Sequence, residues 1–150
     1  MTKPDFVHLT QDEVSLLIDL SQSTAEILHW GKALGKVTSI ASYTKAAMEP
    51  VAHAELDDPM YQSIWRENSR GNTGLPALLG HSSGKRFSQK FEIVSVEQTS
   101  TNATITGRDD HAQLEIKNHY RFLGAGVLGV TQSISNLGSE SFTLNELNVF

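Results

Sequence analysis

The chain has 150 residues, of which 39% are hydrophobic and 19% charged, so it suits one folded domain rather than a disordered segment. Its formal net charge is −5 and its 12 lysines and arginines are scattered. This disfavours nucleic acids and anionic membranes as partners, because both need a basic patch. The absence of cysteine excludes disulfides, thiolate metal sites and thiol catalysis.

The first part of the chain, about residues 6–43, predicts a β-hairpin. Apolar side chains recur at every second position over residues 14–20, which is typical of a half-buried strand. The polar cluster 21–24 predicts a turn, and residues 25–30 predict a second strand that pairs with the first. Trp30 ends this strand, and we expect its ring to pack in the core.

The middle part, about residues 44–84, is interrupted repeatedly by proline and glycine. Short helical turns fit only within residues 43–48 or 60–67. A structureless loop of this length is improbable inside a compact domain unless it is functional or packs on a partner.

The last part, residues 86–150, predicts a series of strands at 91–96, 103–106, 114–122, 127–135 and 142–150. Polar or glycine-containing turns separate them, which favours an antiparallel sandwich or barrel. Asn118 and Gln132 fall on the apolar faces of their strands, so they need hydrogen-bond partners if they are buried. The chain ends within a predicted strand, which suggests a fragment of a longer protein. We therefore expect an all-β fold, with residues 1–150 forming one antiparallel β-sandwich domain or part of one.

Few side chains form a pattern that indicates chemistry. The six histidines show no local metal-binding spacing, so we expect neither a metal nor a cofactor. Asp57–Asp58 and Asp109–Asp110 are neighbours, whereas glycosidases use two carboxylates that face each other across the bond. Both pairs are therefore interpreted mainly as solvated turn residues. Residues 82–85 resemble a hairpin turn more than a phosphate-binding loop.

Trp65 allows two interpretations. It stands among Arg66, Glu67, Asn68 and Arg70. An exposed ring among such polar side chains could stack on a sugar. Alternatively, the ring could pin the long loop to the sheet.

Four segments in order resemble the start of the family 36 α-galactosidases. Leu28–Gly35 is similar to that family's "hWG-x-x-LG" segment, and Glu67–His81 to its "E-x-S-R-G-W-x-G-x-P-x-L-x-G-H" stretch. Phe87–Phe91 fits the strand start that follows, and Gly126–Gly138 a later strand pair. These matches extend from about residue 14 to the last residue.

The resemblance implies a fold and a setting. This chain would form part of an N-terminal β-supersandwich related to galactose mutarotase, packed on a catalytic (β/α)8 barrel that lies outside it. The parent protein would release terminal α-galactose from melibiose or raffinose with retention of configuration, whereas this chain alone would be inactive. The absence of a signal peptide or transmembrane run at the sequence level predicts a cytoplasmic protein.

The resemblance also implies a homo-oligomer in which a loop at about residues 57–74 reaches a neighbour's active site and contacts the α-galactoside substrate. The candidate substrate-binding residues on this loop are Asp57, Asp58, Trp65, Arg70 and Asn72. Asn72 stands where the family has a tryptophan, so either Trp65 compensates from seven residues earlier or the aromatic wall is missing here. Ser82 stands where the family frequently has an arginine, and both differences leave the substrate preference open.

Two other functions remain open. The domain could be a free-standing carbohydrate-binding sandwich, but this needs a concave aromatic face, and the chain has few aromatic residues. It could also be a structural interaction module.

Overall fold

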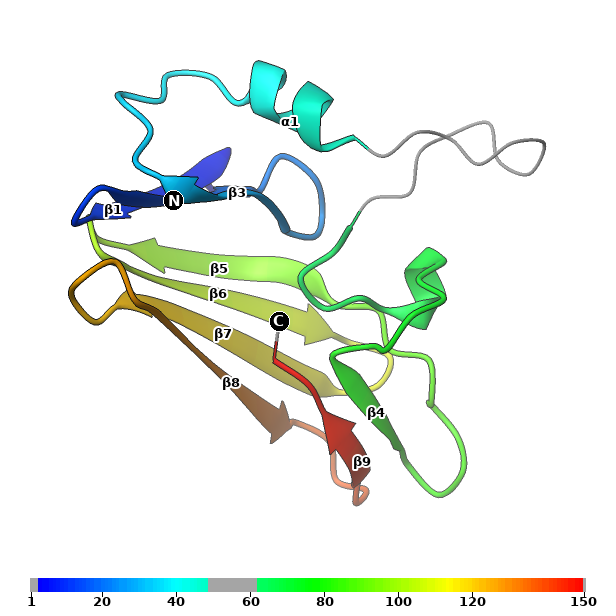
Figure 1. Ribbon diagram of the computed structural model, residues 1–150. Helices are drawn as coiled ribbons and strands as arrows, with labels where there is room; N and C mark the ends of the chain where they lie inside the picture. Colours follow the sequence, from blue (N-terminus) through cyan, green and yellow to red (C-terminus); the bar gives the residue numbers. More distant parts are fainter. Residues whose placement is uncertain (1–2, 49–61, 150) are drawn as a thin grey trace.

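The computed structural model describes residues 3–48 and 62–149 and shows an all-β architecture with antiparallel sheets, as the sequence predicts (Figure 1). The strands are β1 (Phe6–Gln11), β2 (Val14–Asp19), β3 (Glu26–Lys32), β4 (Leu78–His81), β5 (Glu92–Gln98), β6 (Asn102–Asp109), β7 (Leu114–Phe122), β8 (Leu128–Asn136) and β9 (Thr143–Leu147). The helical elements are α1 (Ala41–Ala47) and the 3-10 turn η1 (Asn68–Arg70).

The first layer is a three-stranded antiparallel sheet in the order β1-β2-β3. The predicted hairpin is confirmed, because residues 14–19 pair with residues 26–32. The expectation of a half-buried strand is wrong for β2, since Leu16, Leu17 and Ile18 are all fully buried. The face of this sheet that points away from the core carries Ser15. The chain after β3 crosses this face, and the Leu34 amide donates to Ser15 Oγ at 3.0 Å.

Trp30 does not pack in the core, and that prediction is wrong. It pairs with Leu16 across β2 and β3 but remains 63% exposed. The reason is the position of β3 at the end of the strand order, because a side chain on a terminal strand can extend past the sheet that faces it.

The second layer is a four-stranded meander in the order β5-β6-β7-β8. Alternate residues of β7, from Leu114 to Phe122, are buried, whereas Glu115, Lys117, His119 and Arg121 lie on the opposite face. The predicted strands at 91–96, 103–106, 114–122 and 127–135 are therefore confirmed within a few residues. The two layers lie face to face, and backbone bonds join them from Thr10 to Ser100 and from Ile93 to Ser23 (Figure 1).

A two-stranded ribbon of β4 and β9 stands beside these layers (Figure 1). The final strand was expected from the sequence, but β1 and β4 were not. The short β4 contains Gly80, where an added Cβ would collide with the Phe142 ring and the Thr143 carbonyl. The glycine that interrupts the sequence pattern is thus what allows β4 to lie against the segment leading into β9.

The described residues of the middle part, 44–48 and 62–84, contain little regular structure, as expected. A short helix, α1, covers the predicted turn at 43–48, and η1 lies in the second half of the zone. No helix within residues 3–48 and 62–149 has the length and apolar character needed to cross a bilayer.

We predict that Gly107→Ala destabilises the domain. A Cβ at this position on β6 would lie 2.5 Å from Cη2 of the buried Trp65 ring. Overpacking of this kind costs about 1–3 kcal/mol, which urea denaturation can measure. The control is Gly35→Ala, where the added Cβ meets no described atom within 4 Å. Equal stability of the two variants would contradict the tight packing of Trp65 on β6.

Candidate functional site

Trp65 joins the irregular segment to the core between the sheets. Its side chain is 1% exposed, and its ring centroid lies 5.7 Å from that of Phe91. The indole Nε1 donates to Asn118 Oδ1 at 2.8 Å, and Gln132 Nε2 donates to the same oxygen at 3.3 Å. Asn118 and Gln132 thus find partners in each other and in an indole, while Asn118 Nδ2 and Gln132 Oε1 have no hydrogen-bond partner among the described residues.

The burial of Trp65 decides between its two interpretations. The ring has no exposed face on which a sugar could stack, so the interpretation of Trp65 as an exposed platform is wrong. The alternative, that Trp65 pins the loop to the sheet, is what the structure shows. Backbone bonds from Ile64 N to Ala25 O and from Ala77 N to Trp65 O fix the chain on both sides of the ring.

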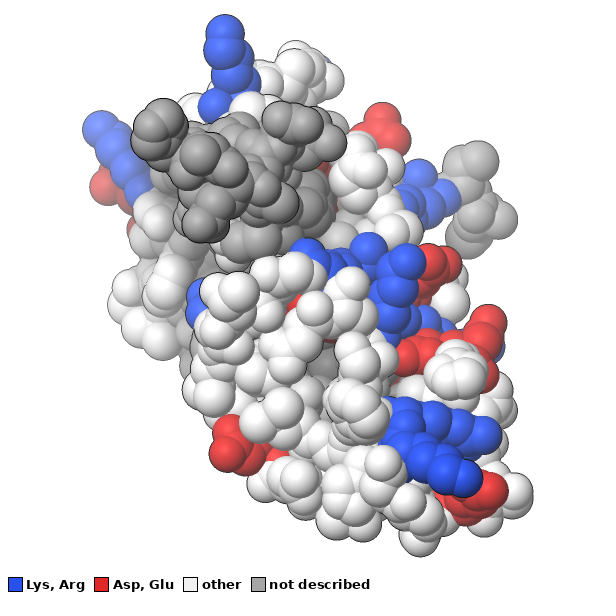
Figure 2. All heavy atoms as spheres, turned by 90° about the vertical axis from the view of Figure 1, so that its right-hand side faces the viewer, with Lys and Arg blue, Asp and Glu red and all other residues white. Residues whose placement is uncertain are grey.

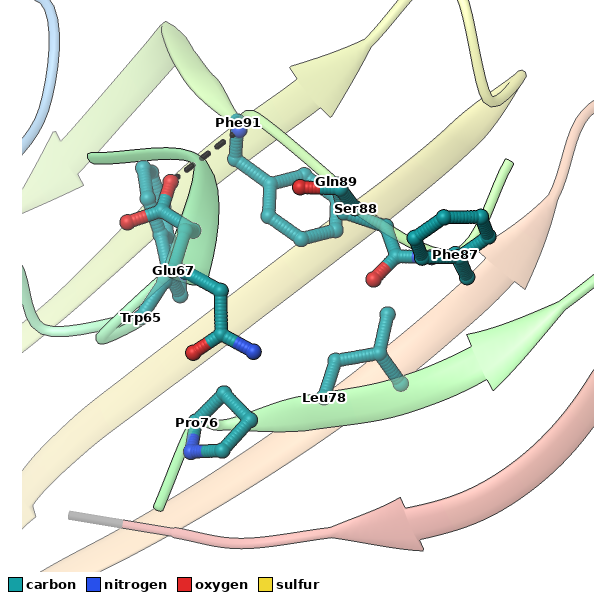
Figure 3. A pocket seen from close by; sticks show the side chains of 9 residues that line it. Trp65, Glu67, Pro76, Leu78, Phe87, Ser88, Gln89 and Phe91 are labelled. Atoms are coloured by element: carbon teal, nitrogen blue, oxygen red, sulfur yellow. Dashed lines mark hydrogen bonds between the residues drawn. The ribbon is translucent and has the colours of Figure 1, made fainter. Parts of the chain in front are cut away.

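Immediately after Trp65, three side chains bond to the strand entry at residues 89–91, and we call Glu67, Ser69 and Arg70 together the clip. Glu67 Oε1 accepts a hydrogen bond from Phe91 N at 3.1 Å (Figure 3). The same oxygen accepts a second hydrogen bond from Arg70 Nε at 3.3 Å. Arg70 Nη2 donates to Phe91 O at 2.7 Å, and Ser69 Oγ donates to Gln89 O at 2.6 Å. The side chains of the clip therefore supply hydrogen-bond partners for backbone groups just before β5.

Asn72 has a comparable role within the loop. Its Nδ2 donates to Arg66 O at 2.8 Å and to Gly74 O at 3.2 Å, which closes a turn. Gly71 precedes it with φ 85°, a left-handed conformation that favours glycine. Arg70 and Asn72 thus both bond within the chain, whereas Asp57 and Asp58 lie outside the described residues.

A small cavity lies next to the clip (Figure 3). It is lined by Trp65, Glu67, Asn68, Pro76, Leu78, Phe87, Ser88, Gln89 and Phe91. Its volume of about 10 Å³ is the size of one water molecule and far below that of a sugar ring. Glu67 Oε2 is buried without a hydrogen-bond partner among the described side chains and backbone, so a single water molecule fits this place.

The remaining candidate groups are structural. The Asp109–Asp110 pair lies at a turn, as expected, but Asp109 is buried and accepts from the amides of Lys90, His111 and Ala112. Residues 82–85 form a tight turn through paired backbone bonds. The described part of the chain contains no group of three His, Asp or Glu side chains that could hold a metal ion.

Glu67 is the residue whose role was missed by inspecting the sequence for chemistry. Its spacing of three residues from Arg70 was visible, but such a pair is usually a solvated contact on a helix. The signal that could have identified it is the combination of an acidic residue with a neighbouring Ser-Arg-Gly, which together suit a turn bonded to another strand.

Comparison with known protein families gives one clear match. Residues 23–150 match the family described as Glycosyl hydrolase family 36 N-terminal domain. No curated protein matches the chain.

Several solved structures share the fold. An AgaA variant, a GH36 α-galactosidase from Geobacillus stearothermophilus in complex with 1-deoxygalactonojirimycin, is 15% identical with a TM-score of 0.72 over 93% of this chain. Another AgaA variant in complex with raffinose is 15% identical with a TM-score of 0.66 over the same share. The α-galactosidase from Lactobacillus brevis is 15% identical with a TM-score of 0.71 over 96% of this chain. The chain spans 23% of the length of each of these proteins.

We predict that Glu67→Gln destabilises the domain by about 1–3 kcal/mol, because Arg70 loses the charge that compensates its partly buried guanidinium. Thermal or urea unfolding measures the change. The control is Glu115→Gln, whose carboxylate pairs with Arg108 and Lys117 on the open face of the sheet, where solvent weakens the attraction. A loss for Glu67→Gln no larger than that for Glu115→Gln would mean that the clip contributes little.

Proposed function

The chain belongs to the glycosyl hydrolase family 36 N-terminal domain family, and on that basis we propose that it is the non-catalytic N-terminal domain of an α-galactosidase. The observation that carries the proposal is the family match over residues 23–150. The proposed substrates are terminal α-galactosides of the melibiose and raffinose type. In support, one structurally similar protein was solved with raffinose bound.

Catalysis is proposed to take place outside this chain, in a (β/α)8 barrel of the same protein. Such a barrel needs about 250 residues, more than this chain contains. A retaining mechanism would use two carboxyl groups about 5 Å apart, one as nucleophile and one as acid and base. The carboxylates of Glu67 and Asp109 are instead bonded to backbone amides here, which suits a supporting role.

The proposed contribution of this domain is to hold a loop for the substrate site of a neighbouring subunit in a homo-oligomer. Trp65 and the clip fix the chain at residues 64–70 to the sandwich, which gives the loop a rigid base. Asp57 and Asp58 are the proposed sugar contacts, because carboxylates accept hydrogen bonds from sugar hydroxyls. Arg70 and Asn72 would act mainly by positioning the loop, since their side chains bond to residues 66, 67, 74 and 91.

The compartment is proposed to be the cytoplasm. The support is the absence of cysteine from the 150 residues, which fits a reducing environment.

We predict that a chromogenic α-galactoside is hydrolysed by the complete protein and not by the 150-residue chain, because the catalytic carboxylates belong to the barrel. Release of the chromophore measures both. Activity of the isolated chain would overturn the assignment of catalysis to another domain. If the complete protein is folded but hydrolyses no α-galactoside, the proposed function is wrong, and a carbohydrate-binding or interaction role is favoured instead.

We predict that Asp57→Asn or Asp58→Asn in the complete protein lowers kcat/KM by roughly tenfold to a hundredfold, the effect of losing a charged hydrogen bond to substrate. Steady-state kinetics on melibiose or raffinose measure it. Asp110→Asn, at the exposed turn after β6, is the matched control. If neither variant differs from this control, the loop does not contact the sugar.

A further inference from the structure

A second hollow, separate from the cavity beside Glu67, opens where the turn after β2 approaches η1. Its volume is about 340 Å³, and it is lined by Gln22, Ser23, Thr24, Ser69, Arg70 and Lys90. All six side chains are polar, two are cationic and none of the six carries a carboxylate. The charged ends of Arg70 and Lys90 are therefore the groups of this lining that could attract a small anion.

The walls of this hollow are fixed by bonds that point away from it into the domain. Ser23 O accepts from Ile93 N at 2.8 Å, and the Thr24 hydroxyl bonds to that of Ser63 at 2.8 Å. Ser69 Oγ donates to Gln89 O, so η1 is tied to the strand entry on the other side. The two walls are thus held at a set distance before any ligand binds, which lowers the entropic cost of binding.

The two cations differ in how they are held. Arg70 donates through Nε to Glu67 and through Nη2 to Phe91, which holds the guanidinium in one orientation and leaves Nη1 without a hydrogen-bond partner among the described residues. The backbone of Lys90 is fixed by its amide, which donates to Asp109 Oδ2 at 2.8 Å. Its ammonium forms no ion pair within residues 3–48 and 62–149. Because Glu67 balances Arg70, the net positive charge of the hollow comes from Lys90.

A third cation, Lys3, contacts the turn after β2. Lys3 Nζ donates to Gln22 O at 2.6 Å, which brings another ammonium group to a lining residue. Lysine and arginine side chains gather across the middle of the face that carries η1 and β4, with acidic side chains beside them (Figure 2).

We propose that this hollow binds a small oxyanion, in the first place a phosphate group, between the Lys90 ammonium and Arg70 Nη1. The Lys90 ammonium and Arg70 Nη1 are cationic donors for the oxygens of such a group, and the side chains of Gln22 and Ser23 supply neutral donors from the turn after β2. The phosphate could be free or could belong to a phosphorylated sugar.

The test is a titration of the isotopically labelled 150-residue chain with inorganic phosphate, followed by amide NMR shifts at constant ionic strength. Constant ionic strength separates site binding from general screening. We expect saturable shifts confined to residues 22–24, 69–70 and 90. Lys90→Gln should weaken the affinity by about fivefold or more, the effect of one charged hydrogen bond. Lys45→Gln, an exposed lysine on α1, makes the same charge change and should leave the affinity unaltered.

Arg70 is left in place in this test because its loss would disturb the clip. Shifts that do not saturate, that spread over the surface, or that respond equally to both lysine variants would overturn the site. Galactose and galactose 1-phosphate distinguish the sources. Tighter binding of the ester than of inorganic phosphate indicates a phosphorylated sugar, and weaker binding indicates free phosphate. Binding of neutral galactose as tight as that of phosphate would refute the anion specificity.

Discussion

The hydrogen bond from the Trp65 indole to Asn118 is the interaction on which the arrangement of this domain depends. It brings together a residue of the irregular segment and one of the central strand β7, separated by 53 positions in the chain. The bond satisfies the indole N–H and the Asn118 carbonyl oxygen, because each of these buried groups would cost free energy if it were left unpaired in a low-dielectric interior. The bond therefore selects one placement of the segment on the sheet, and Gly107 supplies the space for the ring.

The clip extends this anchoring by a few residues. The Glu67 carboxylate accepts hydrogen bonds from the Phe91 amide and from the Arg70 guanidinium, which itself donates to the Phe91 carbonyl. These bonds replace the ones that a further strand would supply at the entry to β5. Breaking a partly buried pair leaves a charge uncompensated, so both members act as a unit. The residues that resemble the family's Glu-x-Ser-Arg-Gly stretch thus have a structural role in this chain.

The packed sheets of this domain form a scaffold, and polar side chains at its surface are left exposed to solvent. The core lies between two sheets, while polar side chains line the hollow beside η1. Such a division is common in proteins, because a stable scaffold can position loop residues whose own backbone carries few packing contacts.

The sequence by itself determined the all-β class, most of the strands and the family, because alternation of apolar and polar residues and the short motifs are local features. It also identified Asn118 and Gln132 as polar groups in need of partners. Only the tertiary structure decided that Trp65 is buried while Trp30 is exposed, since burial depends on which sheet edge extends past the other and on Gly107 under the indole. The strands β1 and β4 and the roles of Glu67 and Arg70 also depended on contacts between distant segments, which no local pattern records.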